Sequence, residues 1–146
     1  MNERSPKDAA KLIVALDLST EEEARELAGL ITPAVNFFKI GTSLFCAQGP
    51  SIIKTLKDMG ASIFLDLKLH DIPEQVRRSA KIIGAFGADM VSVHCLGGQD
   101  MLRAAKEGLA DGAAKAGLES PLVVGVTVLT SLDNSDLEDM GINNKV

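Results

Sequence analysis

The sequence predicts an α/β fold of parallel strands alternating with helices, specifically an incomplete (β/α)8 TIM barrel of about five βα units. Short apolar segments rich in Val, Ile, Leu or Phe alternate with amphipathic segments along the chain. Ionisable side chains recur near the carboxyl ends of successive strands, where a barrel opens into its active-site mouth. The repeat is about 27 residues long, so eight units need on the order of 220 residues. The chain has 146.

Five segments have the length and composition of buried strands. Each is short and rich in β-branched or large apolar residues. Because helical segments separate them, we expect parallel strands joined by right-handed crossovers. The expected strands span residues 11–18, 37–44, 61–69, 90–95 and 122–129.

Amphipathic segments between the strands predict five helices. Ser19 or Thr20 can cap the first helix, and the acidic residues 21–23 suit its positive amino end. Pro73 is a favourable first-turn residue for the third helix. Glycines follow the later helices and indicate where they end. These later helices are expected at about residues 50–59, 73–86, 99–116 and 135–140.

Composition and charge limit the classes of function. The chain is 46% hydrophobic and 24% charged, so it can form a core, and we expect one domain. A net charge of −5 and an aromatic content of 3%, without Trp or Tyr, argue against a nucleic-acid partner. No apolar run reaches the length of a membrane span, and the first residues lack an apolar signal core. We therefore expect no membrane partner and a cytoplasmic location.

Domain boundaries follow from the same reading. Residues 1–10 are expected to be an N-terminal tail, and residues 11–146 the N-terminal part of a barrel domain with strands one to five. Cys46 and Cys95 lack metal-ligand spacing and are expected to be small apolar residues without a disulfide. We expect no metal.

The charges of the third expected strand favour a barrel over a flavodoxin-like doubly wound sheet. Side chains alternate between the two faces of a strand. A doubly wound sheet has helices on both faces and would press two charged side chains against a helix. A barrel directs one face into its interior, where charges near the carboxyl end open into the mouth. The two expected faces hold Leu65, Leu67 and Leu69 on one side and Phe64, Asp66 and Lys68 on the other.

Two lysines and two aspartates on neighbouring strands are the strongest candidates for a functional site. They are Lys39, Asp66, Lys68 and Asp71. Buried ions are normally paired, so one Asp–Lys pair is equally well explained as a structural ion pair. Four such residues on adjacent strands and the following loop favour a site with perturbed proton affinities.

At this point the sequence resembles a known enzyme family. The stretch 64–73, which contains Asp66-x-Lys68-x-x-Asp71, is close to the signature of orotidine 5'-phosphate decarboxylases of the bacterial type. Segments 15–17, 38–41 and 128–131 resemble further family motifs in the expected order. The resemblance covers about residues 11–141. Sister enzymes acting on phosphosugars with Mg²⁺ share the Asp-x-Lys-x-x-Asp piece but typically carry Glu where this chain has Lys39.

The resemblance implies a reaction and a role for each residue. The family converts orotidine 5'-phosphate to UMP in pyrimidine biosynthesis without cofactor or metal. Lys68 is implied as the proton donor to C6 of the pyrimidine, and Asp66 as the residue beside the substrate carboxylate. Asp71 is implied to reach across a homodimer interface into the partner's site. The substrate-binding residues implied in this way are Asp17, Lys39, Asp66, Leu67, Lys68, Leu69, His70, Asp71, Ile72, Pro73, Glu74, Gln75, Thr130 and Ser131.

Within that set, Asp17 and Lys39 are expected at the ribose hydroxyls, and Thr130 and Ser131 near the pyrimidine. Gln75 departs from the family, in which many members carry Thr, although Gln keeps a donor and an acceptor. His70 is expected to be a loop residue at the barrel mouth rather than a catalytic group.

The later βα loops of the family carry the Arg and Gly residues that hold the substrate phosphate, and they have no counterpart in these 146 residues. We therefore expect this chain by itself to have little or no decarboxylase activity. Two alternatives stay open at this stage. One is a Mg²⁺-dependent phosphosugar decarboxylase or aldolase of the same superfamily, and the other is a non-catalytic flavodoxin-like binding module.

Overall fold

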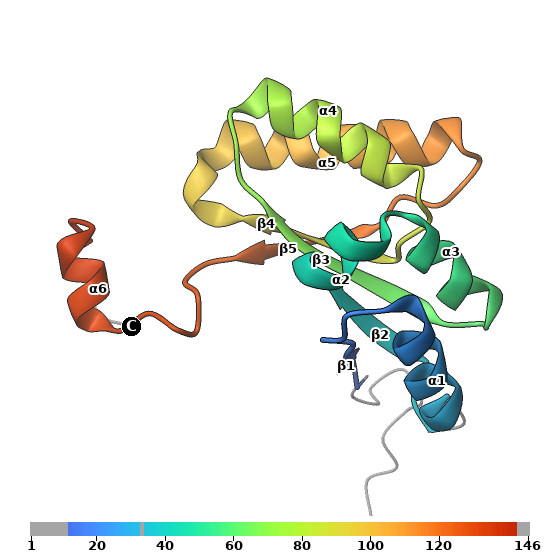
Figure 1. The fold of residues 1–146 in the computed structure, drawn as a ribbon. Helices are drawn as coiled ribbons and strands as arrows, with labels where there is room; N and C mark the ends of the chain where they lie inside the picture. The colour runs from blue at the N-terminus through green and yellow to red at the C-terminus, as the bar shows by residue number, and fades with distance from the viewer. Residues whose placement is uncertain (1–11, 33, 143–146) are drawn as a thin grey trace, which may run out of the picture.

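A computed structural model describes residues 12–32 and 34–142 (Figure 1). Strands and helices alternate along the described chain, as expected from the sequence. The predicted tail, residues 1–10, lies outside the described residues, so its boundary stays a prediction. None of the described helices has the length and apolar character needed to cross a membrane.

The order of the strands decides between the two candidate folds. All neighbouring strands pair in parallel, and the spatial order β1-β2-β3-β4-β5 follows the sequence. A flavodoxin-like sheet has the order 2-1-3-4-5, whereas a barrel sheet advances one strand at a time. The barrel prediction is therefore confirmed for a partial barrel, and the flavodoxin-like alternative is wrong. The strands are β1 (Val14–Ala15), β2 (Phe37–Gly41), β3 (Ser62–Leu69), β4 (Met90–His94) and β5 (Leu122–Val126).

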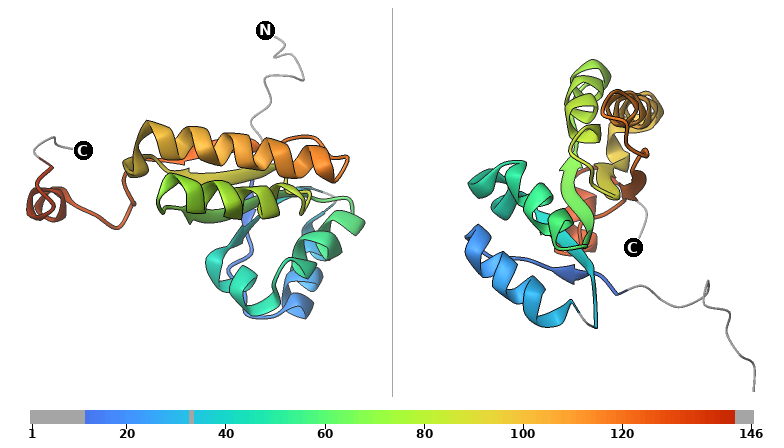
Figure 2. Two further views of the ribbon diagram at one scale, coloured as in Figure 1. Left: turned by 90° about the horizontal axis from the view of Figure 1, so that it is seen from above. Right: turned by 90° about the vertical axis from the view of Figure 1, so that its right-hand side faces the viewer.

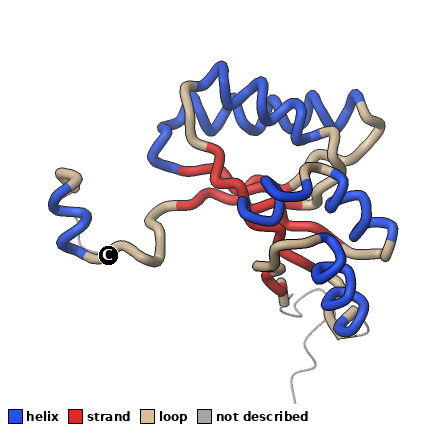
Figure 3. Tube along the Cα trace, viewed as in Figure 1, coloured by secondary structure: helices blue, strands red, loops and turns tan. Residues whose placement is uncertain are grey.

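The crossover helices lie along one side of this sheet (Figure 2). Helices α4 and α5 pack side by side over β3 and β4, and α1 and α3 cover the amino-terminal strands (Figures 1 and 3). The helix α6 stands apart, beyond the carboxyl end of β5 (Figure 1). The helices are α1 (Glu21–Ile31), α2 (Thr42–Gln48), α3 (Ser51–Asp58), α4 (Pro73–Gly84), the 3-10 helix η2 (Cys95–Gly97), α5 (Gly98–Lys115) and α6 (Asn134–Asp139).

Capping at the start of α1 agrees with the sequence. Thr20 accepts a hydrogen bond from the Glu23 N–H, and the Glu23 carboxylate accepts one from the Thr20 N–H in return. This capping box satisfies amide donors that the first turn of a helix leaves without partners. Pro73 begins α4, as expected.

The core lies between the sheet and its helices. Phe38 and Ile40 of β2 and Ile63 and Leu65 of β3 are fully buried, at every second position as a strand requires. The close contact between α4 and α5 depends on glycine, because a Cβ at Gly112 would collide with the Lys81 carbonyl. The helices α4 and α5, which follow β3 and β4 in the chain, thus pack closely against each other.

Three of the expected strands are shorter than predicted by three residues or more, and the other two by one residue. The second ends at Gly41, because residues 42–44 begin α2, a helix that the sequence analysis did not predict. The first is confined to Val14–Ala15, although the Leu16 N–H still donates to the Lys39 carbonyl. The fifth ends at Val126. Short apolar runs fit a strand and a helix turn equally well, which explains the overextension of the second strand.

The third strand also departs from strict alternation. Its register with β4 shifts between Leu65 and Leu69, and Lys68 is the only described non-glycine residue with a positive φ, at 50°. A bulge of this kind bends a strand and redirects its side chains. The regular two-residue alternation expected through Leu69 therefore does not hold at the carboxyl end of β3.

Candidate active site

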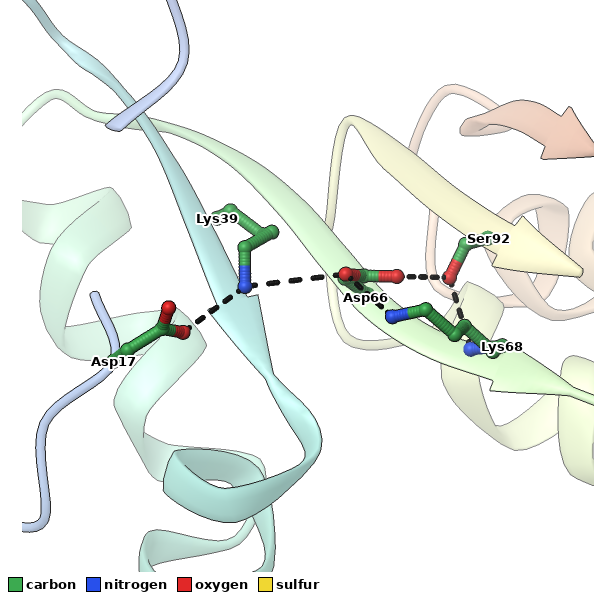
Figure 4. Close-up of polar contacts among 5 residues, drawn as sticks. All are labelled: Asp17, Lys39, Asp66, Lys68 and Ser92. Atoms are coloured by element: carbon green, nitrogen blue, oxygen red, sulfur yellow. Dashed lines mark hydrogen bonds and ion pairs between the residues drawn. The ribbon is translucent and has the colours of Figure 1, made fainter. Parts of the chain in front are cut away.

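Four charged side chains from three neighbouring chain segments meet at the carboxyl edge of the sheet (Figure 4). Asp17 follows β1, Lys39 lies on β2, and Asp66 and Lys68 lie on β3. Parallel strands end at the same edge of a sheet, so residues far apart in sequence become neighbours here. We call these four residues the charge row.

Charges alternate along this row. The Lys39 ammonium donates to Asp17 Oδ1 at 3.0 Å, and it lies 3.9 Å from Asp66 Oδ2. Lys68 Nζ donates to the same Asp66 Oδ2 at 2.8 Å. One oxygen of Asp66 thus faces two ammonium groups. Its negative charge offsets the repulsion between Lys39 and Lys68.

Burial makes Asp66 the centre of the row. Its side chain is 12% exposed, compared with 73% for Asp17. Burial by itself raises the pKa of Asp66, but the hydrogen bonds from Lys68 and Ser92 and the charges of Lys68 and Lys39 outweigh it. The pKa of Asp66 is consequently lower than its ordinary value of 3.8, and the carboxylate is ionised at neutral pH.

Ser92 on β4 extends the row to a fourth strand and is not among the predicted site residues. Its hydroxyl donates to Asp66 Oδ1 at 2.7 Å and accepts from the Lys68 N–H at 2.9 Å (Figure 4). Ser92 and Asp66 are the buried polar residues of the described chain. A polar residue inside the apolar segment 90–93 was the signal that could have drawn attention to it.

An open pocket of about 310 Å³ lies against the row, near the lower end of the range for small-molecule sites. Gly41 leaves room at its wall, because a Cβ there would lie 3.2 Å from Lys39 Nζ and 3.5 Å from Asp17 Oδ1. The pocket therefore exposes the ion pair of Lys39 and Asp17 together with one side of Asp66. Its lining comprises Leu16, Asp17, Leu18, Ser19, Lys39, Gly41, Thr42, Ser43, Leu44, Asp66 and Lys68.

Comparison with known proteins assigns the chain to a family. A model described as "Orotidine 5'-phosphate decarboxylase / HUMPS family" matches residues 10–146. The chain belongs to this family.

Relatives and solved structures agree with that assignment. An orotidine 5'-phosphate decarboxylase of Carboxydothermus hydrogenoformans is 46% identical over 136 residues, which cover 93% of this chain and 56% of that protein. The crystal structure of an uncharacterized conserved protein from Geobacillus kaustophilus matches with a TM-score of 0.84 and 40% identity, covering 92% of this chain and 62% of that one. The crystal structure of orotidine 5'-phosphate decarboxylase from Lactobacillus acidophilus matches with a TM-score of 0.77 and 38% identity, covering 93% of this chain and 60% of that one. The chain thus spans little more than half the length of the curated relatives it matches.

In this family member, several expected site residues lie outside the pocket. Asp71 is exposed in the loop after β3, where its carboxylate accepts a hydrogen bond from the Ile72 N–H at 2.7 Å. Ile72 is 68% exposed beside it. Thr130 and Ser131 are exposed in the turn between β5 and α6. Their expected contacts with substrate stay predictions.

The remaining expected residues surround the end of β3. Leu67 and Leu69 are partly buried and pack against the core, so they support the strand that carries Asp66 and Lys68. Pro73, Glu74 and Gln75 form the exposed first turn of α4, where Glu74 accepts a hydrogen bond from Arg78. Their expected roles toward substrate also stay predictions.

His70 and His94 form a separate feature next to the row. Their rings stack at 4.9 Å between centroids and 16° between planes. They border a mainly apolar pocket that Leu137 and Met140 of the α6 region help to line. Across the parts of the chain that the structure describes, no three His, Cys, Asp or Glu side chains gather as a metal site.

Proposed function

We propose that the charge row is the catalytic centre for decarboxylation of orotidine 5'-phosphate to UMP in pyrimidine biosynthesis. The observation that carries the proposal is the position of Asp66 Oδ2 between the ammonium groups of Lys39 and Lys68, at 3.9 and 2.8 Å. Membership of the family and relatives named orotidine 5'-phosphate decarboxylase support the choice of substrate. A cytoplasmic location is part of the proposal, as for other enzymes of nucleotide synthesis.

The reaction demands stabilisation of negative charge on carbon. The bond between C6 and the carboxylate breaks, CO₂ leaves, and the bonding electron pair stays on C6. A fixed ammonium group stabilises that charge better in a preorganised site than water does. Lys68 transfers a proton from Nζ to C6, and the resulting neutral amine regains a proton from solvent.

The other members of the row prepare Lys68 for this step. Asp66 holds the Lys68 ammonium by a hydrogen bond of 2.8 Å, and its carboxylate lies beside the position proposed for the substrate carboxylate. Asp17 and Lys39 border the pocket and offer an acceptor and a donor to the ribose hydroxyls. Substrate binding at these outer positions orients the pyrimidine toward Lys68.

Lys39 supports a metal-free reaction. The sister enzymes that depend on Mg²⁺ typically carry Glu at this position, where a carboxylate can serve as a ligand for a hard cation. Here an ammonium group lies between the carboxylates of Asp17 and Asp66. It supplies a fixed positive charge between two carboxylates.

We also propose a homodimer in which Asp71 acts in the partner's site. Support comes from the exposure of Asp71 and Ile72 at the loop after β3, outside the pocket formed by their own chain. A residue that completes a neighbouring site has to be exposed in its own protomer. Mixing Lys68→Ala and Asp71→Ala variants of a complete version should restore activity, because each mixed dimer then contains one intact site. Mixed dimers that form and stay inactive would contradict the shared site.

Turnover tests the main proposal. We would follow the loss of orotidine 5'-phosphate absorbance with the 146-residue chain, and with this chain joined to the segment of the Carboxydothermus hydrogenoformans relative that lies beyond the matched region. The chain alone should turn over little or no substrate, because remote binding of the phosphate supplies much of the energy of catalysis. The joined protein should be active, and the added segment by itself should not.

Substitutions then assign the chemistry. Lys68→Ala should reduce turnover of the joined protein by about 10²- to 10⁴-fold, the usual contribution of a positioned acid. Lys54→Ala is the matched control, since Lys54 is exposed on α3 and pairs with Asp58. A folded joined protein without turnover, or one indifferent to Lys68→Ala, contradicts the proposal. Activation by added Mg²⁺ and loss with chelator would favour the phosphosugar alternative.

A further inference from the structure

The hydroxyl of Ser92 forms hydrogen bonds with Asp66 and Lys68, two residues of the charge row. It donates to Asp66 Oδ1 at 2.7 Å and accepts from the Lys68 N–H at 2.9 Å. Ser92 is fully buried on β4, between the equally buried Val91 and Val93. Burying a hydroxyl among apolar neighbours is unfavourable unless it is hydrogen-bonded, so these two bonds account for its presence.

Ser92 fixes the orientation of the Asp66 carboxylate. With Oδ1 held by Ser92, Oδ2 is the oxygen that faces Lys68 at 2.8 Å and Lys39 at 3.9 Å. Without the serine hydroxyl, only the two lysines hold the carboxylate, whose last side-chain torsion has a broad energy profile. The hydrogen bond from Ser92 to Oδ1 therefore leaves Oδ2 as the oxygen that carries the ion pairs.

Ser92 also supports the backbone from which the Lys68 side chain projects. Lys68 has a φ of 50°, a left-handed conformation that is unfavourable for a residue with a Cβ. It lies where the pairing of β3 with β4 is interrupted, between Leu65 and Leu69. A partly buried N–H at such an interruption lacks its partner in the sheet, and the Ser92 hydroxyl supplies another acceptor.

We propose that Ser92 is a positioning residue of the charge row, whose hydroxyl sets the orientation of the Asp66 carboxylate and the backbone of Lys68. This inference rests on the proposed function, because it assigns Ser92 to the preparation of the proton donor. Ser92 lies on β4, next to the strand that holds Asp66 and Lys68, and it acts through these two residues.

The test uses nuclear magnetic resonance on the 146-residue chain, without substrate. In the Ser92→Ala variant, the pKa of Asp66 should be higher than in the unmodified chain, because a hydrogen bond to the ionised carboxylate is lost. The ionisable groups facing Asp66 are Lys68 from β3 and Lys39 from β2, with Asp17 beyond Lys39. The substitution alters none of these three residues chemically, so the change reports on the loss of the Ser92 hydroxyl.

Hydrogen exchange provides the second measurement. Exchange of the Lys68 amide should become faster by about tenfold or more in Ser92→Ala, since a partly buried donor loses its acceptor. Ser92→Thr keeps the hydroxyl and should preserve both the Asp66 titration and the slow exchange. Ser62→Ala, at the other end of β3, is the matched control and should change neither.

Each outcome decides the inference. If Ser92→Ala folds and leaves both measurements unchanged, or if Ser62→Ala changes them equally, Ser92 is not a positioning residue. If Ser92→Ala does not fold, the hydroxyl proton of Ser92 is observed in the unmodified chain. Slow exchange and a coupling to the Asp66 carboxylate support the inference. Free exchange with solvent overturns it. The titration and exchange measurements need no substrate, so they test Ser92 independently of the reaction. A joined protein without Lys68-dependent turnover would instead contradict the proposed function.

Discussion

Replacing Asp66 by Asn is the sharpest test of the electrostatics of the site. The substitution keeps the size of the side chain and an oxygen for Ser92, but it removes the charge between Lys39 and Lys68. The two ammonium groups are then left to repel each other, with only the exposed Asp17 nearby. We expect Asp66→Asn to destabilise the fold at neutral pH.

The magnitude follows from burial. Breaking a fully buried ion pair costs about 3–5 kcal/mol, and an exposed pair contributes about 0.2–1 kcal/mol. Asp66 is 12% exposed, but Lys68 is 39% exposed, so solvent screening places the cost near 2 kcal/mol. The control is Asp58→Asn: the Asp58–Lys54 pair is shorter, at 2.6 Å, yet its side chains are 65% and 77% exposed. Its loss should cost about 0.3–0.5 kcal/mol.

Urea unfolding followed by circular dichroism measures both variants, because the chain contains no Trp or Tyr for intrinsic fluorescence. With a typical slope of about 2 kcal/mol per molar urea, the midpoint should fall by about 1 M for Asp66→Asn and by about 0.2 M for Asp58→Asn. Equal shifts would show that burial does not set the strength of these pairs, and a larger shift for Asp58→Asn would show that distance does. A more stable Asp66→Asn variant would refute the view that Asp66 balances the two lysines.

Two further predictions concern acid stability and helix packing. Because the pKa of Asp66 is lower in the folded chain than its ordinary 3.8, its contribution to stability is present above 3.8 and is lost as pH falls through the folded value; acid titration of stability should be flatter in Asp66→Asn. Gly112→Ala should cost about 1–3 kcal/mol because its Cβ collides with the Lys81 carbonyl. Gly29→Ala, whose Cβ meets only Met59 at 3.8 Å, should instead stabilise α1 by up to about 1 kcal/mol; thermal unfolding that ranks these two glycine variants in the opposite order would contradict this account.

The fold class and the heart of the site were predictable because both depend on local signals. Alternating apolar and amphipathic segments predict a βα repeat, and the repeat implies parallel strands with a shared carboxyl edge. Asp66 and Lys68 occur in the carboxyl-terminal half of one predicted strand and Lys39 on the neighbouring predicted strand, so their proximity follows from the topology. Glycine and capping residues predicted most helix limits to within a few residues.

Other features depend on contacts between distant segments. The helix α2 replaces the end of a predicted strand, since a short apolar run fits both structures. The interruption in β3 at Lys68 arises from the register between β3 and β4. The residues around Lys68 in the sequence do not predict it. Ser92 was missed for the same reason: its role requires a partner 26 positions away in the chain.

The sequence by itself determined the repeating βα architecture, the family to which the chain is similar, and the positions of the lysines and aspartates. These are encoded in periodicity and in short motifs. Only the tertiary structure decided which oxygen of Asp66 faces which ammonium group, how Lys68 projects from an interrupted strand, and that Ser92 holds both. The physical reason is that burial and hydrogen-bond geometry depend on the register between strands, and register is set by the packing of the whole sheet against its helices.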